Sequence, residues 1–155
     1  MNEPTDNPGV IARPPLLYAG TLIVALLVNL IWPLPIFGDK LGRWCGLVLA
    51  VIGAAIVAWG RNSLVAGDTP VDPTLPTTAI VTSGPYRFSR NPLYVGLTAI
   101  FLGLTMTMNT WWGILALIPL ALVMHNAVVL REERYLEQKF GEIYRQYRSK
   151  VRRYL

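Results

Sequence analysis

Charged residues are absent from three long stretches of this chain, which cover residues 14–38, 44–60 and 91–130. A helix needs about 20 apolar residues to cross the roughly 30 Å hydrocarbon core of a bilayer. The third stretch is long enough for two crossings, and Met108-Asn109-Thr110 is its natural break. The pattern therefore predicts four membrane helices, the last two forming a tight hairpin, near residues 14–33, 42–62, 92–108 and 111–131.

The composition agrees with a membrane location. Hydrophobic residues make up 53% of the chain and charged residues only 15%, against about 25% charged in a soluble domain. A soluble all-helical core is the alternative, but it needs charged outer faces that the first, third and fourth predicted helices lack. Tryptophans favour the headgroup layer, and all five lie at or near predicted helix ends: Trp32, Trp44, Trp59, Trp111 and Trp112. We predict an all-α, polytopic membrane protein with one domain, residues 1–155.

The distribution of basic residues predicts the orientation. Four crossings place both termini and the loop between the second and third helices on one side of the membrane. Of the 14 Lys and Arg residues, only Lys40 and Arg43 fall on the other side. Since cytoplasmic loops are enriched in Lys and Arg, both termini are expected in the cytoplasm, with the protein in the inner membrane if the organism is bacterial. The net charge of +5 thus reflects topology and the lipid bilayer as a partner, and it does not indicate nucleic-acid binding.

The sequence offers no metal site. His125 is the one histidine and Cys45 the one cysteine, and no carboxylate cluster accompanies either of them. We therefore predict no metal.

The loop between the second and third predicted helices carries distinctive chemistry. Its prolines exclude a long helix, although residues 77–82 are long enough for a short extended segment. Asn91-Pro92 predicts the start of the third helix, since Asn is a favoured cap and Pro a favoured first helical residue. Capping alone is a sufficient reason for this pair, and a ligand-binding role for Asn91 is the alternative.

A second polar group follows the fourth predicted helix. Glu132 and Glu133 lie at the cytoplasmic edge of that helix, where adjacent carboxylates need partners or water. Because helices three and four are antiparallel neighbours, the start of one and the end of the other lie side by side. The prediction brings Tyr86, Arg90, Asn91 and Tyr94 close to Arg131, Glu132 and Glu133. An ordinary Arg/Glu rim that anchors the hairpin at the headgroups is the alternative.

The chain beyond this point keeps a helical pattern. Apolar residues recur at spacings of three or four, which predicts an amphipathic cytoplasmic helix: Leu136, Phe140, Tyr144, Tyr147 and Val151. Gly141 is expected to mark a bend. Such a helix fits the membrane surface, and it fits equally a lid folded back over the loop.

Together these segments resemble a known family. The pattern is Gly84-Pro85-Tyr86-x-x-x-Arg90-Asn91-Pro92-x-Tyr94-x-Gly96 followed by Glu132-Glu133-x-x-Leu136-x-x-x-Phe140-Gly141-x-x-Tyr144-x-x-Tyr147. It resembles the isoprenylcysteine carboxyl methyltransferases and, equally, the related phospholipid N-methyltransferases. The resemblance covers roughly residues 68–155.

The resemblance implies a site for S-adenosylmethionine between the loop, the start of helix three and the end of helix four. The family's motif positions correspond here to cofactor-binding Thr78, Ala79, Ile80, Val81, Tyr86, Arg90, Asn91, Pro92, Leu93, Tyr94 and Glu132. A carboxylate suits the cofactor's ammonium, and tyrosine faces suit its adenine and sulfonium. Arg131 and Glu133 are the expected catalytic residues: Arg131 for a substrate carboxylate, and Glu133 as a base if the acceptor is an amine or thiol.

Two departures from the family pattern leave the methyl acceptor open. The isoprenylcysteine enzymes hold the substrate carboxylate with an Arg four residues before the Glu pair, and Val128 occupies that position here. Asn91 replaces their His. The expected activity is methylation of a hydrophobic or lipid-like acceptor, with phospholipid N-methylation, small-thiol S-methylation and a non-catalytic scaffold or sensor as alternatives.

Overall fold

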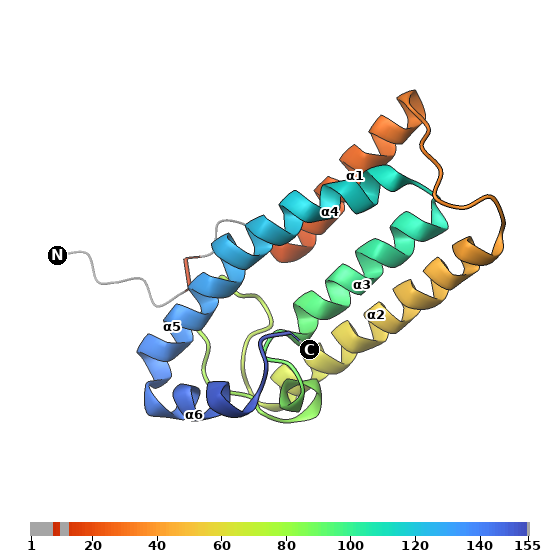
Figure 1. Cartoon of the computed structure of the whole chain (residues 1–155). Helices are drawn as coiled ribbons and strands as arrows, with labels where there is room; N and C mark the ends of the chain where they lie inside the picture. Colours follow the sequence, from red (N-terminus) through yellow and green to blue (C-terminus); the bar gives the residue numbers. More distant parts are fainter. Residues whose placement is uncertain (1–7, 10–12, 155) are drawn as a thin grey trace.

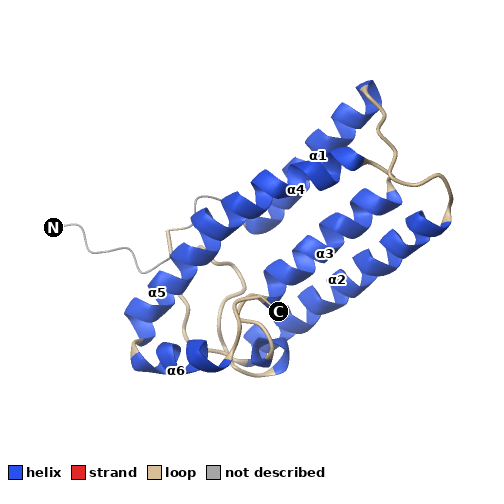
Figure 2. Ribbon diagram, viewed as in Figure 1, coloured by secondary structure: helices blue, strands red, loops and turns tan. Residues whose placement is uncertain are grey.

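The computed structural model describes residues 8–9 and 13–154, and within them the chain is built from helices and loops (Figure 2). The predicted all-α class is confirmed. The elements are α1 (Pro14–Ile31), α2 (Leu41–Ala66), the short 3-10 helix η1 (Gly84–Arg87), α3 (Pro92–Thr107), α4 (Trp111–Val123), the π-helix η2 (Met124–Val129), α5 (Leu130–Phe140) and α6 (Glu142–Lys150).

Three helical spans within the described residues are long and apolar enough to cross a membrane. They are α1, α2 and the continuous helix Trp111–Phe140, which is formed by α4, η2 and α5. The predicted crossing at 92–108 corresponds to α3, a helix of 16 residues that measures about 24 Å at 1.5 Å per residue. The chain is therefore a multi-pass membrane protein, and α3 falls short of the length that the fourth predicted crossing requires.

The predicted helix boundaries differ from the structure by more than two residues at two places. The second helix continues four residues beyond the expected end at 62, to Ala66. The fourth continues past 131 to Phe140, after which Gly141 bends the chain with a φ of 53°. This bend confirms the prediction made for Gly141.

The helices run up and down between two ends of the molecule (Figure 1). At one end, Asn109 turns the chain from α3 into α4 with a φ of 57°. Its side-chain oxygen accepts hydrogen bonds from the backbone nitrogens of Ile36 (3.0 Å) and Phe37 (2.7 Å), and its amide nitrogen donates to the Phe37 oxygen (3.1 Å). The expected break at Asn109 thus also fastens the α1–α2 connection.

The closest helix packing joins α2 and α3, whereas α4 lies against α1 (Figure 1). α2 carries glycines seven residues apart at Gly46, Gly53 and Gly60, and α3 carries Gly96 and Gly103. A Cβ placed on Gly53 would lie 2.7 Å from the Gly96 carbonyl oxygen. The two backbones therefore nearly touch, as small residues allow in membrane helices. The predicted hairpin of the last two helices keeps its short turn, but α3 packs more closely against α2 than against α4.

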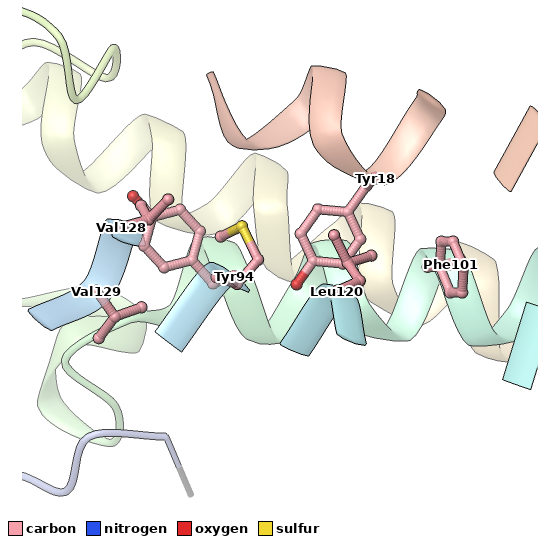
Figure 3. Close-up of a cluster of buried hydrophobic side chains, with 7 residues drawn as sticks. Tyr18, Tyr94, Phe101, Leu120, Val128 and Val129 are labelled. Atoms are coloured by element: carbon pink, nitrogen blue, oxygen red, sulfur yellow. The ribbon is translucent and has the colours of Figure 1, made fainter. Parts of the chain in front are cut away.

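A buried apolar core forms where α1, α3 and the long helix meet (Figure 3). Tyr18 of α1 packs edge-on against Phe101 of α3 at 6.0 Å between ring centroids. The Tyr18 hydroxyl shares a 2.7 Å hydrogen bond with Thr98, so its polar atom is satisfied inside the core. Tyr94, Val128 and Val129 extend this core toward the other end of the molecule.

Substituting Gly53 with Ala is expected to lower the thermal unfolding midpoint of the detergent-solubilised protein. The added Cβ meets backbone atoms of Gly96 and Ile100, both at 2.7 Å, so α2 and α3 must move apart. Such overpacking costs about 1–3 kcal/mol. Tryptophan fluorescence during heating measures the shift.

Gly20→Ala in α1 is the matched control, because its added Cβ meets no other segment within 4 Å. Alanine has the higher helix propensity by roughly 1 kcal/mol, so this control should keep or raise the midpoint. Equal shifts in the two variants would contradict the role assigned to the glycines.

Candidate active site

A cavity of about 490 Å³ lies at the end of the molecule opposite Asn109. It is lined by α2 and the loop that follows it, by the starts of α1 and α3, and by α5 and α6. Its polar and aromatic lining comprises Arg13, Arg61, Thr69, Asp72, Thr77, Tyr86, Arg90, Asn91, Tyr94, Glu132, Glu133, Tyr144 and Tyr147.

The remaining wall is largely apolar and comes mainly from membrane helices. Its helical residues are Pro14, Pro15 and Leu16 of α1, Val57 and Leu64 of α2, Leu93 and Leu97 of α3, and Leu136 of α5. One part of the cavity wall is therefore charged, and the other part is apolar and formed by helices of the membrane region. Small-molecule sites commonly have this combination of a mostly apolar wall and a few convergent polar groups.

Local hydrogen bonds fold the loop after α2 against the cavity. The buried Thr69 hydroxyl accepts from the backbone nitrogens of Thr78 (3.0 Å) and Ala79 (3.4 Å). The Thr77 nitrogen donates to the Tyr135 hydroxyl of α5 at 3.2 Å. The loop is thus fixed on both sides, and it presents Ala79, Ile80 and Val81 to the cavity. Residues 77–82 form an irregular segment, since no strand is assigned there.

Glu132 joins α5 to α3. The Tyr94 hydroxyl donates a 2.8 Å hydrogen bond to Glu132 Oε2. This contact confirms the expectation that the start of the third helix and the end of the fourth lie side by side. Among the described residues, only Tyr94 donates a hydrogen bond to the Glu132 carboxylate.

Glu133 is buried, with 7% of its side chain exposed, and lies between two guanidinium groups. Arg153 donates to both of its oxygens, from Nε to Oε1 at 3.0 Å and from Nη2 to Oε2 at 2.9 Å. Arg90 Nη1 approaches Oε1 at 3.2 Å. A buried carboxylate needs such paired donors, because burying an unpaired charge is costly.

Arg90 retains unused donors. Its Nε and Nη1 are buried and make no hydrogen bond within the part of the chain that the structure describes. Arg90 Nη1 is therefore close enough to Glu133 Oε1 for an ion pair, but its geometry does not form a hydrogen bond. Buried donors without partners are uncommon in proteins, and Arg90 lines the cavity.

Aromatic hydroxyls around the cavity stay protonated at neutral pH. Burial, followed by the charge of Glu133, raises the pKa of Tyr144 to about 12. Burial also raises the pKa of Tyr86 and of Tyr147 far above the usual phenol value. The Tyr147 hydroxyl donates to the Tyr86 carbonyl at 2.7 Å, so α6 folds back over the loop, the second of the two arrangements expected for this helix.

Most of the predicted site residues line the cavity together. They are Ala79, Ile80, Val81, Tyr86, Arg90, Asn91, Leu93, Tyr94, Glu132 and Glu133. Thr78 and Pro92 lie beside it without lining it. Arg131 is exposed and points away, since its Nη1 donates to the Gly9 carbonyl at 2.9 Å.

Asn91 stands immediately before α3, but its side chain does not cap that helix. Its Nδ2 donates instead to the Arg153 carbonyl at 3.1 Å. The capping interpretation is thus right about the position and wrong about the side chain. The reason is that residues 151–154 return to this point and compete for the amide.

Sequence reasoning missed the site roles of two arginines, which entered only the charge balance. Arg61 of α2 lines the cavity, and Arg153 pairs with Glu133. The position of Arg61 near the C-terminal end of α2, just before the loop that lines the cavity, was a usable signal. No local pattern marks Arg153, because it lies beyond the last helix and its partner is 20 residues away on α5.

The π-helix η2 ends at Val129, and two residues separate it from the Glu pair. Its wider turn changes the helical register between α4 and α5. Val128 lies in this segment and is fully buried in the apolar core. The position that carries a substrate-binding Arg in the isoprenylcysteine enzymes is therefore a packing position in this chain.

Comparisons with known proteins agree with this arrangement. The family model of phospholipid methyltransferases matches residues 41–143. An uncharacterized protein of Haemophilus influenzae is 41% identical over 63 residues, which are 41% of this chain and the whole of that relative. No solved structure matches the chain. Because the family match covers more than half of its length, the chain belongs to the phospholipid methyltransferase family, which shares a clan of membrane methyltransferases with the isoprenylcysteine carboxyl methyltransferases.

Proposed function

We propose that this protein is an S-adenosylmethionine-dependent methyltransferase acting on a hydrophobic or lipid-like acceptor. One observation carries the proposal: a single cavity has Glu132 and Arg90 on its polar side and membrane-helix residues on its apolar side. A water-soluble methyl donor and an acceptor with an apolar tail require different surroundings, and this cavity offers both.

The residues present fit the cofactor. The volume of about 490 Å³ lies within the usual range of roughly 300–1,000 Å³ for ligand pockets. Arg90 has buried donors without hydrogen-bond partners, and these suit a carboxylate. Glu132 suits an ammonium group. The neutral faces of Tyr86 and Tyr94 suit adenine and a nearby sulfonium.

When bound, the cofactor supplies a methyl group already activated by its positive sulfur. The protein's contribution is then to hold donor and acceptor in line and to exclude water. Tyr94 orients the Glu132 carboxylate through its hydroxyl. Tyr144 and Tyr147 of α6 cover the cavity and hold the loop that carries Tyr86.

The cavity end of the molecule is proposed to face the cytoplasm. Basic residues gather at this end, whereas Lys40 and Arg43 lie near the opposite end, in agreement with the positive-inside rule. The cofactor would then reach the cavity from the cytoplasm. The acceptor would reach it along the apolar wall of α1, α2 and α3.

Glu133 is better suited to positioning than to removing a proton. Both of its oxygens accept hydrogen bonds from Arg153, and Arg90 lies beside it. A carboxylate acceptor needs no base, because it is already ionised at neutral pH. Glu132 makes fewer such contacts, since only Tyr94 hydrogen-bonds to it among the described residues, and it is therefore the carboxylate of the pair that is assigned to the ligand.

Arg61 is the proposed contact for an acidic acceptor. Arg131, expected in this role from the sequence, is directed toward Gly9 and does not line the cavity. Arg61 lines it and makes no ion pair with any described residue, whereas Arg13 pairs with Asp72 at 3.1 Å. A phospholipid amine is the second candidate acceptor, favoured by the family to which the chain belongs.

Glu132→Gln is expected to weaken binding of S-adenosylmethionine at least about tenfold, since a charge-assisted hydrogen bond contributes roughly 1.5–3 kcal/mol. Calorimetry on protein in nanodiscs measures the dissociation constant. Glu142→Gln is the control, because Glu142 is exposed on α6, pairs with Arg145 and does not line the cavity. Unchanged affinity in Glu132→Gln would refute the assignment of this site, and no binding by the intact protein would favour a non-catalytic scaffold or sensor.

Arg61→Gln is expected to raise the KM for an acidic acceptor about tenfold or more while leaving S-adenosylmethionine affinity within about twofold, since a lost contact to a charged group is worth roughly 1.5–3 kcal/mol. Arg131→Gln should change neither value. Steady-state transfer of a labelled methyl group measures both variants. A KM effect in Arg131→Gln alone would restore the assignment made from the sequence.

The class of acceptor is expected to show in the stability of the methylated product. A carboxyl methyl ester releases methanol in base, whereas an N-methyl or S-methyl product retains its label. Lipid extracts incubated with protein and labelled donor are therefore treated with alkali, and the volatile label is counted. Release of the label identifies a carboxyl acceptor, and retention excludes it.

A further inference from the structure

The segment that follows α6 returns to the start of α3. Residues 151–154, here named the strap, run beside residues 89–91. The Arg90 nitrogen donates to the Arg152 carbonyl at 2.9 Å, and Asn91 Nδ2 donates to the Arg153 carbonyl at 3.1 Å. The strap thus fixes the backbone of Arg90 and delivers the Arg153 side chain to Glu133.

Arg153 itself does not line the cavity. About 30% of its side chain is exposed, against 7% for Glu133 and 9% for Arg90. It therefore satisfies a buried carboxylate from the outer side. Glu133 and Arg90 form the inner side of the same cluster.

Arg153 and Arg90 share one carboxylate unequally. Arg153 makes two aligned hydrogen bonds to Glu133, at 3.0 and 2.9 Å. Arg90 makes a 3.2 Å ion pair and keeps Nε and Nη1 without a hydrogen bond among the described residues. Because the fork of Arg153 satisfies Glu133, Nε and Nη1 of Arg90, a residue of the cavity lining, are left without a hydrogen bond among the described residues.

We propose that Arg153 is a positioning residue that keeps Arg90 available for the carboxylate of the bound methyl donor. The inference rests on the proposed function. Without Arg153, Glu133 is left with Arg90 as its one remaining cationic partner in the cluster and draws that guanidinium into hydrogen bonds. Arg90 would then be held by Glu133 and would no longer offset the negative charge of Glu132 and Glu133 next to a ligand carboxylate.

Loss of Arg153 should consequently penalise the ligand's carboxylate and spare its other groups. The test compares S-adenosylmethionine with its decarboxylated analogue, which keeps the adenine, the sulfonium and the ammonium. Calorimetry in nanodiscs gives both dissociation constants for the intact protein, Arg153→Gln and Arg152→Gln. Arg152→Gln removes the same charge from the strap, but its side chain is exposed and its carbonyl contact to Arg90 remains.

In Arg153→Gln, the affinity for S-adenosylmethionine should fall about tenfold or more, while that for the decarboxylated analogue stays within about twofold. Arg152→Gln should change neither affinity. Arg153→Lys keeps the charge without the two-pronged fork and should give an intermediate ratio of the two constants. If Arg153→Gln does not fold, the ratio measured for Arg153→Lys tests the proposal in its place.

Equal losses for both ligands would overturn the inference, because a residue that only holds the fold affects both alike. Unchanged affinities in Arg153→Gln would overturn it as well. Failure of the intact protein to bind S-adenosylmethionine would instead overturn the proposed function. The two failures are therefore distinguishable in one set of titrations.

Discussion

A carboxylate buried at the end of a membrane helix must be matched by positive charge, and Glu133 imposes this constraint on the fold. Its partners come from the loop before α3 and from the strap after α6. Satisfying one residue of α5 therefore requires two distant segments to meet. The cavity exists where they meet, because the same contacts place Arg90, Asn91 and Tyr144 around it.

The opposite constraint comes from the membrane helices, where close packing replaces charge. Lipid provides no hydrophobic drive for helices to associate, so small residues that permit close contact take its place. Gly53 and Gly103 bring the backbones of α2 and α3 together. This closely packed pair carries Arg61 on one helix and Tyr94 on the other to the same cavity.

The different roles of Glu132 and Glu133 follow from their contacts. Glu133 is enclosed by guanidinium groups and serves the structure of the site. Glu132, one residue away, meets Tyr94 and faces the cavity. Two identical side chains adjacent in sequence thus acquire different roles, since successive residues on a helix point about 100° apart.

The sequence by itself determined the membrane class, the break at Asn109 and the proximity of Tyr94 to Glu132, because hydropathy and helical spacing are local properties of the chain. The same properties indicated the loop after α2, which lines the cavity, and the bend at Gly141. Tertiary structure alone decided that Arg153 pairs with Glu133 and that Arg131 points away from the cavity. Such pairings depend on where sequence-distant segments return in space, and neither composition nor periodicity encodes that return.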